Sequence, residues 1–175
     1  LEDYARLPGP HVTPEWMWDL KEYVERRLAD PELDGVVVTH GTDTLEETAF
    51  LLDLALATDR PVVLTGAMKT ASDVLWDGPA NLLGACRVAA EPAAAARGVL
   101  VVLDGKVHAA REVTKTSTSR LQTFRSPDFG CLAHADAEVL AAHRRVLQPH
   151  RAGLAATYQP TFRRDGQIAT TVRTG

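Results

Sequence analysis

Three short apolar runs constrain the fold more than any other feature of this sequence. They span residues 35–39, 61–66 and 98–103, are rich in Val and Leu, and show no alternation with polar side chains. Such runs are typical of parallel strands that are buried on both faces of a sheet. Segments with helical periodicity separate them, so the sequence predicts βαβ units with right-handed crossovers in an open parallel sheet.

The intervening helices have recognisable boundaries. Thr13-Pro14-Glu15 combines an N-cap residue, a proline at the first helical position and an acid in the first turn, and Asp30-Pro31 ends that helix. A second helix begins after Asp43 or Thr44 and continues to about residue 57, and a third spans about 79–90. We therefore predict an α/β fold, in which an open, mostly parallel sheet with flanking helices forms a three-layer sandwich of the Rossmann or flavodoxin type.

Composition limits the classes of function. The chain has 175 residues, 45% of them hydrophobic, which is enough for one domain with a real core. The formal net charge of -4 gives no electrostatic reason to expect nucleic acid or an anionic membrane as partner. The sequence contains no run of about 20 apolar residues and opens with no signal peptide. We expect a cytoplasmic protein that binds neither nucleic acid nor membrane.

Polar residues that follow the predicted strands are the candidates for chemistry, because ligands of open parallel sheets bind at the carboxyl ends of the strands. Residues 39–44 follow the first strand and read Thr-His-Gly-Thr-Asp-Thr, which places Thr42 and Asp43 at a helix N-terminus with free amide N–H groups. Lys115 follows the third strand after a short extended ribbon, predicted over 107–115.

Each of these residues also has a purely structural interpretation. Thr42 and Asp43 are ordinary N-cap residue types, and Lys115 taken alone is a solvated surface lysine. His40 taken alone is a packed or hydrogen-bonded histidine, and the threonines at 114, 116 and 118 alternate as on the outer face of a strand. Local patterns leave these alternatives open.

Longer strings in the sequence resemble the bacterial-type L-asparaginases. The run from Gly35 to Phe50, Gly-Val-Val-Val-Thr-His-Gly-Thr-Asp-Thr-Leu-Glu-Glu-Thr-Ala-Phe, is similar to the second signature of that family. The strings Leu-Thr-Gly-Ala-Met at 64–68, Asp-Gly-Pro-Ala-Asn at 77–81 and Val-Thr-Lys-Thr at 113–116 follow in family order and spacing. The resemblance covers roughly residues 11–135.

This resemblance implies an amidohydrolase that converts L-asparagine to L-aspartate and ammonia through a threonine acyl-enzyme. A threonine hydroxyl is a poor nucleophile that needs a base and an oxyanion site. By resemblance, Thr42, Lys115 and Asp43 are the catalytic residues, with a neutral Lys115 taking a proton from Thr42. Asp43 also binds the α-amino group of the substrate, and His40 orients the loop.

The resemblance implies further substrate contacts. The backbone N–H of Thr42 and the region of Ala67 hold the carboxamide and its oxyanion, and Gly9 and His11 lie where the family binds the α-carboxylate. It implies no metal and no cofactor, a small amino-acid amide as substrate, and a homodimer or homotetramer for the intact protein. The choice between asparagine and glutamine stays open, because it depends on contacts of methylene scale.

Two departures from the family pattern limit these expectations. No Gly-Gly-Thr-Ile-type strand, which carries the family's first nucleophilic threonine, occurs here, and the chain reads Gly9-Pro10-His11 where the family has a Ser and a polar residue for the α-carboxylate. We expect the first strand to be missing for the first reason. We expect the C-terminal domain to be missing because the sequence no longer matches the family after about residue 145. We divide the chain into an asparaginase N-terminal α/β domain over 1–135, truncated at its start, and a divergent or poorly structured segment over 136–175. Two alternatives therefore stay open: a non-catalytic fold remnant or binding domain, and the related subunit of a tRNA-dependent amidotransferase.

Overall fold

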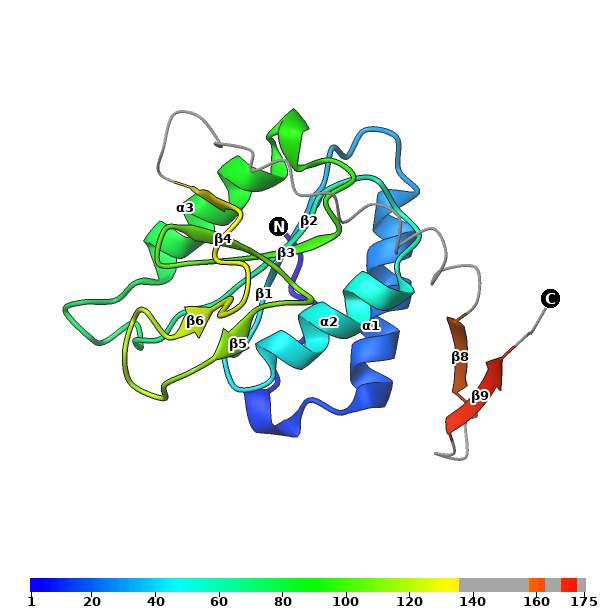
Figure 1. The fold of residues 1–175 in the computed structure, drawn as a ribbon, viewed down its shortest axis with the longest axis horizontal. Helices are drawn as coiled ribbons and strands as arrows, with labels where there is room; N and C mark the ends of the chain where they lie inside the picture. Colours follow the sequence, from blue (N-terminus) through cyan, green and yellow to red (C-terminus); the bar gives the residue numbers. More distant parts are fainter. Residues whose placement is uncertain (136–157, 163–167, 173–175) are drawn as a thin grey trace.

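The computed structural model describes residues 1–135, 158–162 and 168–172 (Figure 1). Its α-helices are α1 (Pro14–Leu28), α2 (Leu45–Ala55) and α3 (Gly78–Ala89), and its two short 3-10 helices span Gly9–His11 and Pro92–Ala94. Its strands are β1 (Val36–Thr39), β2 (Val62–Thr65), β3 (Val99–Leu103), β4 (Lys106–Ala109), β5 (Thr114–Lys115), β6 (Phe124–Arg125), β7 (Ala133–His134), β8 (Tyr158–Phe162) and β9 (Ile168–Val172).

Five strands form the main sheet in the order β1-β2-β3-β4-β7. The first three strands are parallel, with Val37 opposite Val63 and Val63 opposite Leu100. Strands β4 and β7 join antiparallel, so the sheet is mixed but largely parallel. The predicted α/β class with an open, mostly parallel sheet is confirmed.

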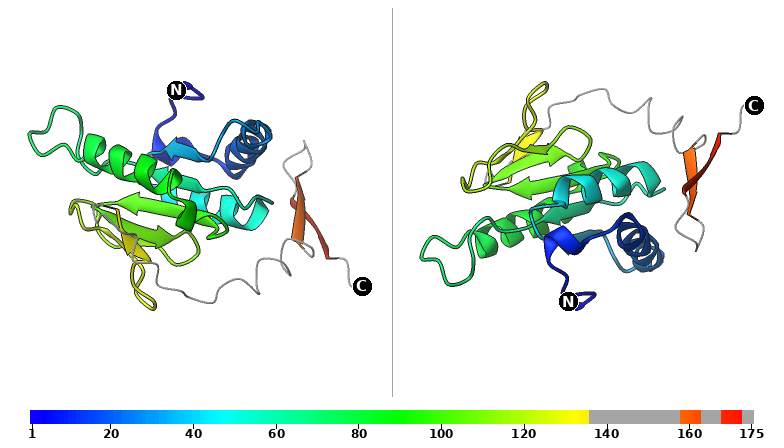
Figure 2. Two further views of the ribbon diagram at one scale, coloured as in Figure 1. Left: turned by 90° about the horizontal axis from the view of Figure 1, so that it is seen from above. Right: turned by 90° about the horizontal axis from the view of Figure 1, so that it is seen from below.

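Helices cover both faces of this sheet and make three layers (Figure 2). Helices α1 and α2 pack on one face, where Leu20, Leu52 and Leu64 belong to one buried cluster. Helix α3 packs on the other face, where Val88 and Val102 belong to a second cluster. The alternation of neighbouring strand residues between the two clusters accounts for the apolar runs without polar interruption.

The prediction of right-handed crossovers throughout is wrong for one of the two. Strands β1, β2 and β3 lie side by side in chain order, yet α2 and α3, which connect them, lie on opposite faces. Two crossovers that advance in the same direction and use opposite faces must have opposite hands, so one is left-handed. About 98 % of such connections are right-handed. The long connection 66–77 between β2 and α3 provides the chain length that lets α3 reach the other face.

Strand β1 is less buried than its apolar sequence predicts. Every residue of β2 and β3 is buried, whereas Val36, Val37 and Val38 are only partly buried and Thr39 is exposed. The reason is position, because β1 forms an edge of the five-stranded sheet and no other described strand pairs with its outer side.

The remaining described strands form two small two-stranded sheets in addition to the main one. The ribbon predicted over 107–115 divides into β4, which joins the main sheet, and β5, which pairs with β6 in a separate two-stranded sheet. Strands β8 and β9 pair antiparallel with each other. Most of the segment 136–175 lies outside the described residues, so its predicted divergence or lack of structure stays a prediction. None of the helices in the described part is long and apolar enough to cross a membrane.

Candidate functional site

The structure brings Thr42, Asp43 and Lys115 together. Thr42 and Asp43 lie in the connection between β1 and α2, and Lys115 reaches them from β5. Its Nζ lies 2.9 Å from Thr42 Oγ1 and 2.8 Å from Asp43 Oδ1, and it donates a hydrogen bond to each. Two segments more than 70 residues apart in sequence therefore meet through one amino group.

Helix capping does not account for the polar residues before α2. The N-cap position is Thr44, and no side chain caps the helix through a hydrogen bond. The Thr44 hydroxyl donates instead to the carbonyl of Gly9 at 2.9 Å, which ties the N-terminal segment to this connection. The Asp43 carboxylate forms an ion pair with Lys115. By contrast, Thr13 caps α1 as predicted, since its hydroxyl oxygen accepts a hydrogen bond from the Trp16 N–H.

Lys115 is not a solvated surface lysine. Its side chain is 15% exposed, whereas that of Asp43 is 59% exposed. An ion pair with one solvated partner is worth little stability, about 1 kcal/mol or less. The arrangement therefore contributes more to the placement of the amine beside the Thr42 hydroxyl than to the stability of the fold.

His40 holds the backbone of the connection. Its Nδ1 lies 2.7 Å from the carbonyl oxygen of Gly41, its Nε2 lies 3.1 Å from Thr48 Oγ1, and Trp16 stacks edge-on against the ring. Burial lowers the pKa of His40, while the Gly41 carbonyl and the charge of Glu47 act in the opposite direction. Both ring nitrogens are engaged by the loop and by α2, which is consistent with the predicted role in orienting the loop.

Glycines let three backbone segments approach closely at this point. A Cβ built on Gly9 would lie 3.2 Å from the Cβ of Asp43, and one on Gly41 would lie 3.2 Å from the Gly9 backbone. A Cβ on Gly66 would lie 2.5 Å from the His40 carbonyl oxygen and 3.3 Å from Thr42 Cγ2. Gly9, predicted as a substrate contact, therefore lies against Asp43.

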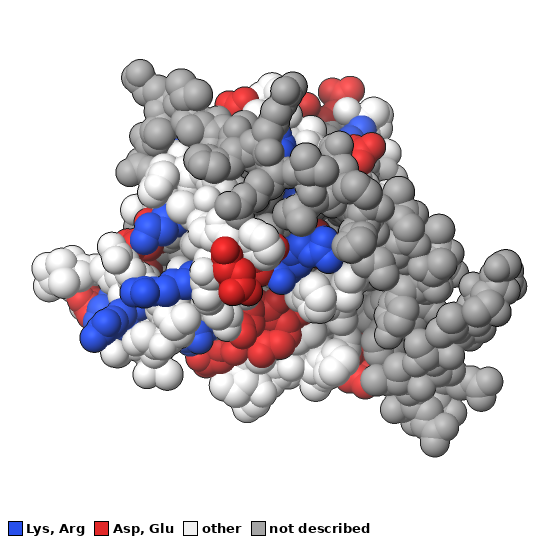
Figure 3. Space-filling view, viewed as in Figure 1, with Lys and Arg blue, Asp and Glu red and all other residues white. Residues whose placement is uncertain are grey.

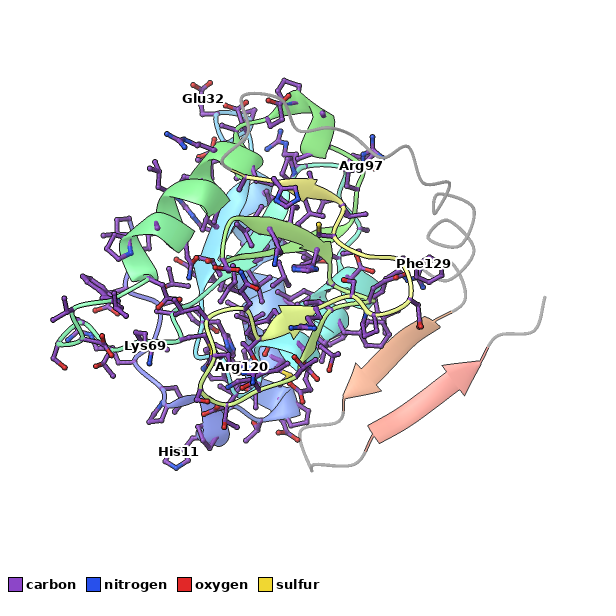
Figure 4. The ribbon with its side chains drawn as sticks, turned by 60° about the vertical axis from the view of Figure 1, so that its left-hand side comes forward. His11, Glu32, Lys69, Arg97, Arg120 and Phe129 are labelled. Carbon is purple, nitrogen blue, oxygen red and sulfur yellow. The ribbon has the colours of Figure 1, made fainter. Side chains whose placement is uncertain are left out.

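The other two predicted substrate contacts, Ala67 and His11, have different surroundings. Ala67 follows β2 and lines a cavity of about 440 Å³, together with Thr39, His40 and Trp76. His11 is exposed, and Figure 4 shows its side chain projecting outward at the margin of the fold. No hydrogen bond among the described residues joins His11 to Thr42, Asp43 or Lys115.

Two acidic residues and an amide that were not among the predicted site residues organise the surroundings, although all three lie in strings that resemble the family. Glu46, in the first turn of α2, accepts hydrogen bonds from the backbone N–H of Lys115 and from the Thr114 hydroxyl. Asp77 accepts from the backbone N–H groups of residues 68 and 69. Asn81, which is 3% exposed, donates to the Gly66 carbonyl and to Asp77 and accepts from the backbone of residue 104, so it joins the ends of β2 and β3.

Charge is concentrated on this side of the molecule. Figure 3 shows acidic side chains gathered where Figure 1 places the start of α2 and β5, with basic side chains on both sides. Within the described residues, no group of three or more His, Cys, Asp or Glu side chains could hold a metal ion.

Comparison with known proteins matches the same region of the chain. The family described as "Asparaginase, N-terminal" matches residues 1–147. A "Probable L-asparaginase" of Deinococcus radiodurans is 56% identical over 118 residues, which cover 67% of this chain and 36% of that protein. "L-asparaginase 2" of Bacillus subtilis is 47% identical over 129 residues, covering 74% of this chain and 34% of that protein.

A solved structure agrees in fold. The crystal structure of a probable cytoplasmic L-asparaginase from Campylobacter jejuni superposes with a TM-score of 0.72 at 39% identity, covering 74% of this chain and 40% of that one. The chain thus spans about a third to two fifths of the length of these proteins. The family match and the shared fold show that this chain belongs to the asparaginase family, whose N-terminal domain it resembles.

Proposed function

We propose that this chain contributes the Thr42–Asp43–Lys115 centre of an enzyme that hydrolyses L-asparagine to L-aspartate and ammonia. The observation that carries the proposal is the placement of the Lys115 amine within 2.9 Å of the Thr42 hydroxyl and 2.8 Å of the Asp43 carboxylate. A nucleophile and a base within hydrogen-bond reach, with a third group that orients the base, is the general arrangement of nucleophilic catalysis. Membership of the asparaginase family supports the same chemistry.

The first step of the proposed reaction is attack of Thr42 Oγ1 on the carbon of the side-chain amide. In its neutral form Lys115 accepts the hydroxyl proton as the new C–O bond forms, and the resulting ammonium can then return a proton to the leaving nitrogen. Loss of ammonia leaves an ester between the substrate acyl group and Thr42. Attack of water on that ester releases aspartate and restores the hydroxyl.

Backbone donors support the charged intermediate in this scheme. The Thr42 N–H lies in the connection just before α2, and the free N–H groups of the first turn of α2 add positive potential for a developing oxyanion. Ala67, on the connection after β2, contributes to the opposite side of the carboxamide. Asp43 binds the α-amino group of the substrate through a charge-assisted hydrogen bond, which its exposed position permits. Gly9 lies beside Asp43 and leaves room for the substrate backbone, and His11 is assigned to the α-carboxylate only through the sequence resemblance.

Replacement of Lys115 by Met tests the proposal. We expect the Lys115→Met variant to lose ammonia release from L-asparagine by about 100-fold or more, which is the range for removal of a general base. Lys21→Met is the matched control, because Lys21 is similarly buried, at 13% exposed, and lies on α1. Unchanged turnover in Lys115→Met would remove Lys115 from the mechanism.

The assay needs two protein forms, because this chain spans only about a third of the Bacillus subtilis relative. One is the chain alone, and the other is a chimera in which residues 11–135 replace the matching segment of that relative. Activity of the chimera that depends on Lys115 supports the proposal. An inactive chimera that folds as the relative does would favour a non-catalytic fold remnant instead.

Assembly and location belong to the same proposal. We propose a homodimer or homotetramer in the cytoplasm, for which mass measurement in solution should give a multiple of the protomer mass. The names of relatives include both compartments, with a periplasmic protein in Haemophilus influenzae and a cytoplasmic one in Campylobacter jejuni. Fractionation of cells that express the protein tests the location directly.

A further inference from the structure

The carboxylate of Glu46 accepts hydrogen bonds from both residues of β5. Its Oε1 accepts a hydrogen bond from Thr114 Oγ1 at 3.1 Å, and its Oε2 accepts one from the backbone N–H of Lys115. The two donors belong to consecutive residues, so each oxygen of the carboxylate binds one of two adjacent residues. Hydrogen bonds to an ionised acceptor are shorter and stronger than neutral ones.

Strand β5 has few other polar attachments to the main fold. It is two residues long, and among the described strands it pairs only with β6, in a sheet that is separate from the five-stranded one. Val113 and Phe124, at 6% and 4% exposed, anchor the apolar side of this ribbon in the core beside Leu45. Apolar packing holds the ribbon down but does not fix its position along α2, whereas two directional hydrogen bonds do.

The Glu46 carboxylate and the candidate nucleophile stand close together in the chain. Thr42 and Asp43 lie just before Thr44, the N-cap residue of α2, and Glu46 stands in the first turn of that helix. The Lys115 amine is at the end of a flexible four-carbon stem, so its distance to Thr42 depends on where the Lys115 backbone is held. A displacement of about 1 Å can cost about 100-fold in rate when reacting groups must be aligned.

We propose that Glu46 is a positioning residue that clamps β5 to the start of α2 and thereby holds the Lys115 amine against the Thr42 hydroxyl. The inference rests on the proposed function for its catalytic meaning, but the clamp itself can be tested without turnover. Its exposed neighbour Glu47 makes neither of the two contacts to β5 and provides a matched control on the same helical turn.

Two substitutions separate the geometry of the clamp from its charge. Glu46→Gln removes the charge but keeps the length of the side chain, so its carbonyl can accept from the Lys115 N–H and its amide can donate to the Thr114 hydroxyl. Glu46→Asp keeps the charge but is one methylene shorter and cannot reach both donors. If Glu46 acts as a clamp, Gln at this position preserves the two hydrogen bonds to β5 and Asp does not.

The experiment measures the rate of acetylation of each lysine by mass spectrometry of peptides. The sequence contains four lysines, so each is assigned without ambiguity. Lys21, on α1, is 13% exposed against 15% for Lys115 and serves as the internal reference for global opening. We expect Glu46→Asp to raise the rate at Lys115 about tenfold at constant Lys21, and Glu46→Gln to stay within about twofold of the parent.

The remaining outcomes decide against the clamp. A rise at Lys115 in Glu46→Gln but not in Glu46→Asp would assign the effect to charge, and an equal rise at Lys21 would make Glu46 a support of the whole fold. An unchanged Lys115 in both variants, or the same rise in Glu47→Asp, also overturns the inference.

Turnover gives a second reading in the chimera described above. There we expect Glu46→Asp to lower kcat about 100-fold with KM preserved, and Glu46→Gln to keep kcat within about tenfold. A rise in KM alone in Glu46→Asp overturns the positioning role. Labelling results that support the clamp in an inactive chimera would instead count against the proposed function alone.

Discussion

Acid should destabilise this fold through one buried histidine. His108, on β4, is 2% exposed, and its Nε2 has no hydrogen-bond partner among the described residues. Its Nδ1 lies 3.0 Å from Ser126 Oγ. Burial lowers the pKa of His108 to about 4, and the charges of Lys106 and His134 act in the same direction. Protonation would place an N–H with no acceptor and a positive charge in the sheet core.

The size of the effect follows from the two pKa values. Above the ordinary histidine pKa of 6.5 the ring is neutral in both the folded and the unfolded chain. As the pH falls below 6.5, His108 becomes protonated in the unfolded chain, whereas in the folded chain it stays neutral until about pH 4. The free energy of unfolding therefore decreases between these two pH values. At about 1.36 kcal/mol for each pKa unit, the full loss is about 3 kcal/mol, and about 2 kcal/mol is lost between pH 7 and pH 5.

The assay is urea unfolding followed by tryptophan fluorescence, near pH 7 and near pH 5, on the parent chain and on His108→Phe. Other groups titrate over the same range, so the informative quantity is the difference between the two proteins in their pH dependence. The lost Ser126 contact lowers the stability of His108→Phe by the same amount at both pH values and cancels. We expect the parent to lose about 2 kcal/mol more than His108→Phe on acidification.

An exposed histidine provides the control. His11→Gln removes an exposed histidine and is measured at the same two pH values, as the control for loss of a histidine outside the core. If His108→Phe lost as much stability as the parent between the two pH values, the lowered pKa of His108 would not be the cause of the acid destabilisation, and the reasoning would be refuted.

Three substitutions test other parts of the fold. Gly66→Ala should lower the free energy of unfolding by about 2 kcal/mol, because the new Cβ would lie 2.5 Å from the His40 carbonyl oxygen, and urea unfolding measures it. Asn81→Ala should cost about 3 kcal/mol in the same assay, because it removes the buried amide that joins β2 to β3 and leaves its partners unsatisfied. Thr13→Ala should cost about 1 kcal/mol through loss of the cap on Trp16 N–H, and a fall of less than about 0.3 kcal/mol would contradict the capping role.

Local patterns predicted the regular elements because their determinants are local. Thr13-Pro14 fixes the start of α1 through a side-chain cap and a preset backbone angle, and the structure begins the helix at Pro14. The apolar runs of β2 and β3 are buried along their whole length. Here propensity, pattern and tertiary position agree, which is when reasoning from sequence succeeds.

Local patterns did not predict features that depend on tertiary contacts. The handedness of a crossover depends on which face receives the helix, and no residue of α3 records that choice in its own periodicity. Thr44 has the residue type of an N-cap, yet its hydroxyl donates to Gly9, because the N-terminal segment offers a carbonyl there. Glu46 resembled any acid in a first helical turn, and only the arrival of β5 beside it gives it partners.

The same contrast explains how the candidate site is built. Its stationary half, Thr42 and Asp43, stands at the junction of β1 and α2, where glycines at 9, 41 and 66 let the backbone segments approach within van der Waals contact. Its other half, Lys115, arrives on a ribbon that is joined to this junction by side chains rather than by the ladder of the main sheet. Side-chain hydrogen bonds can be broken one at a time, whereas a ladder opens cooperatively. The distance between amine and hydroxyl is therefore the feature of this site that single substitutions can change while the sheet beneath it stays intact.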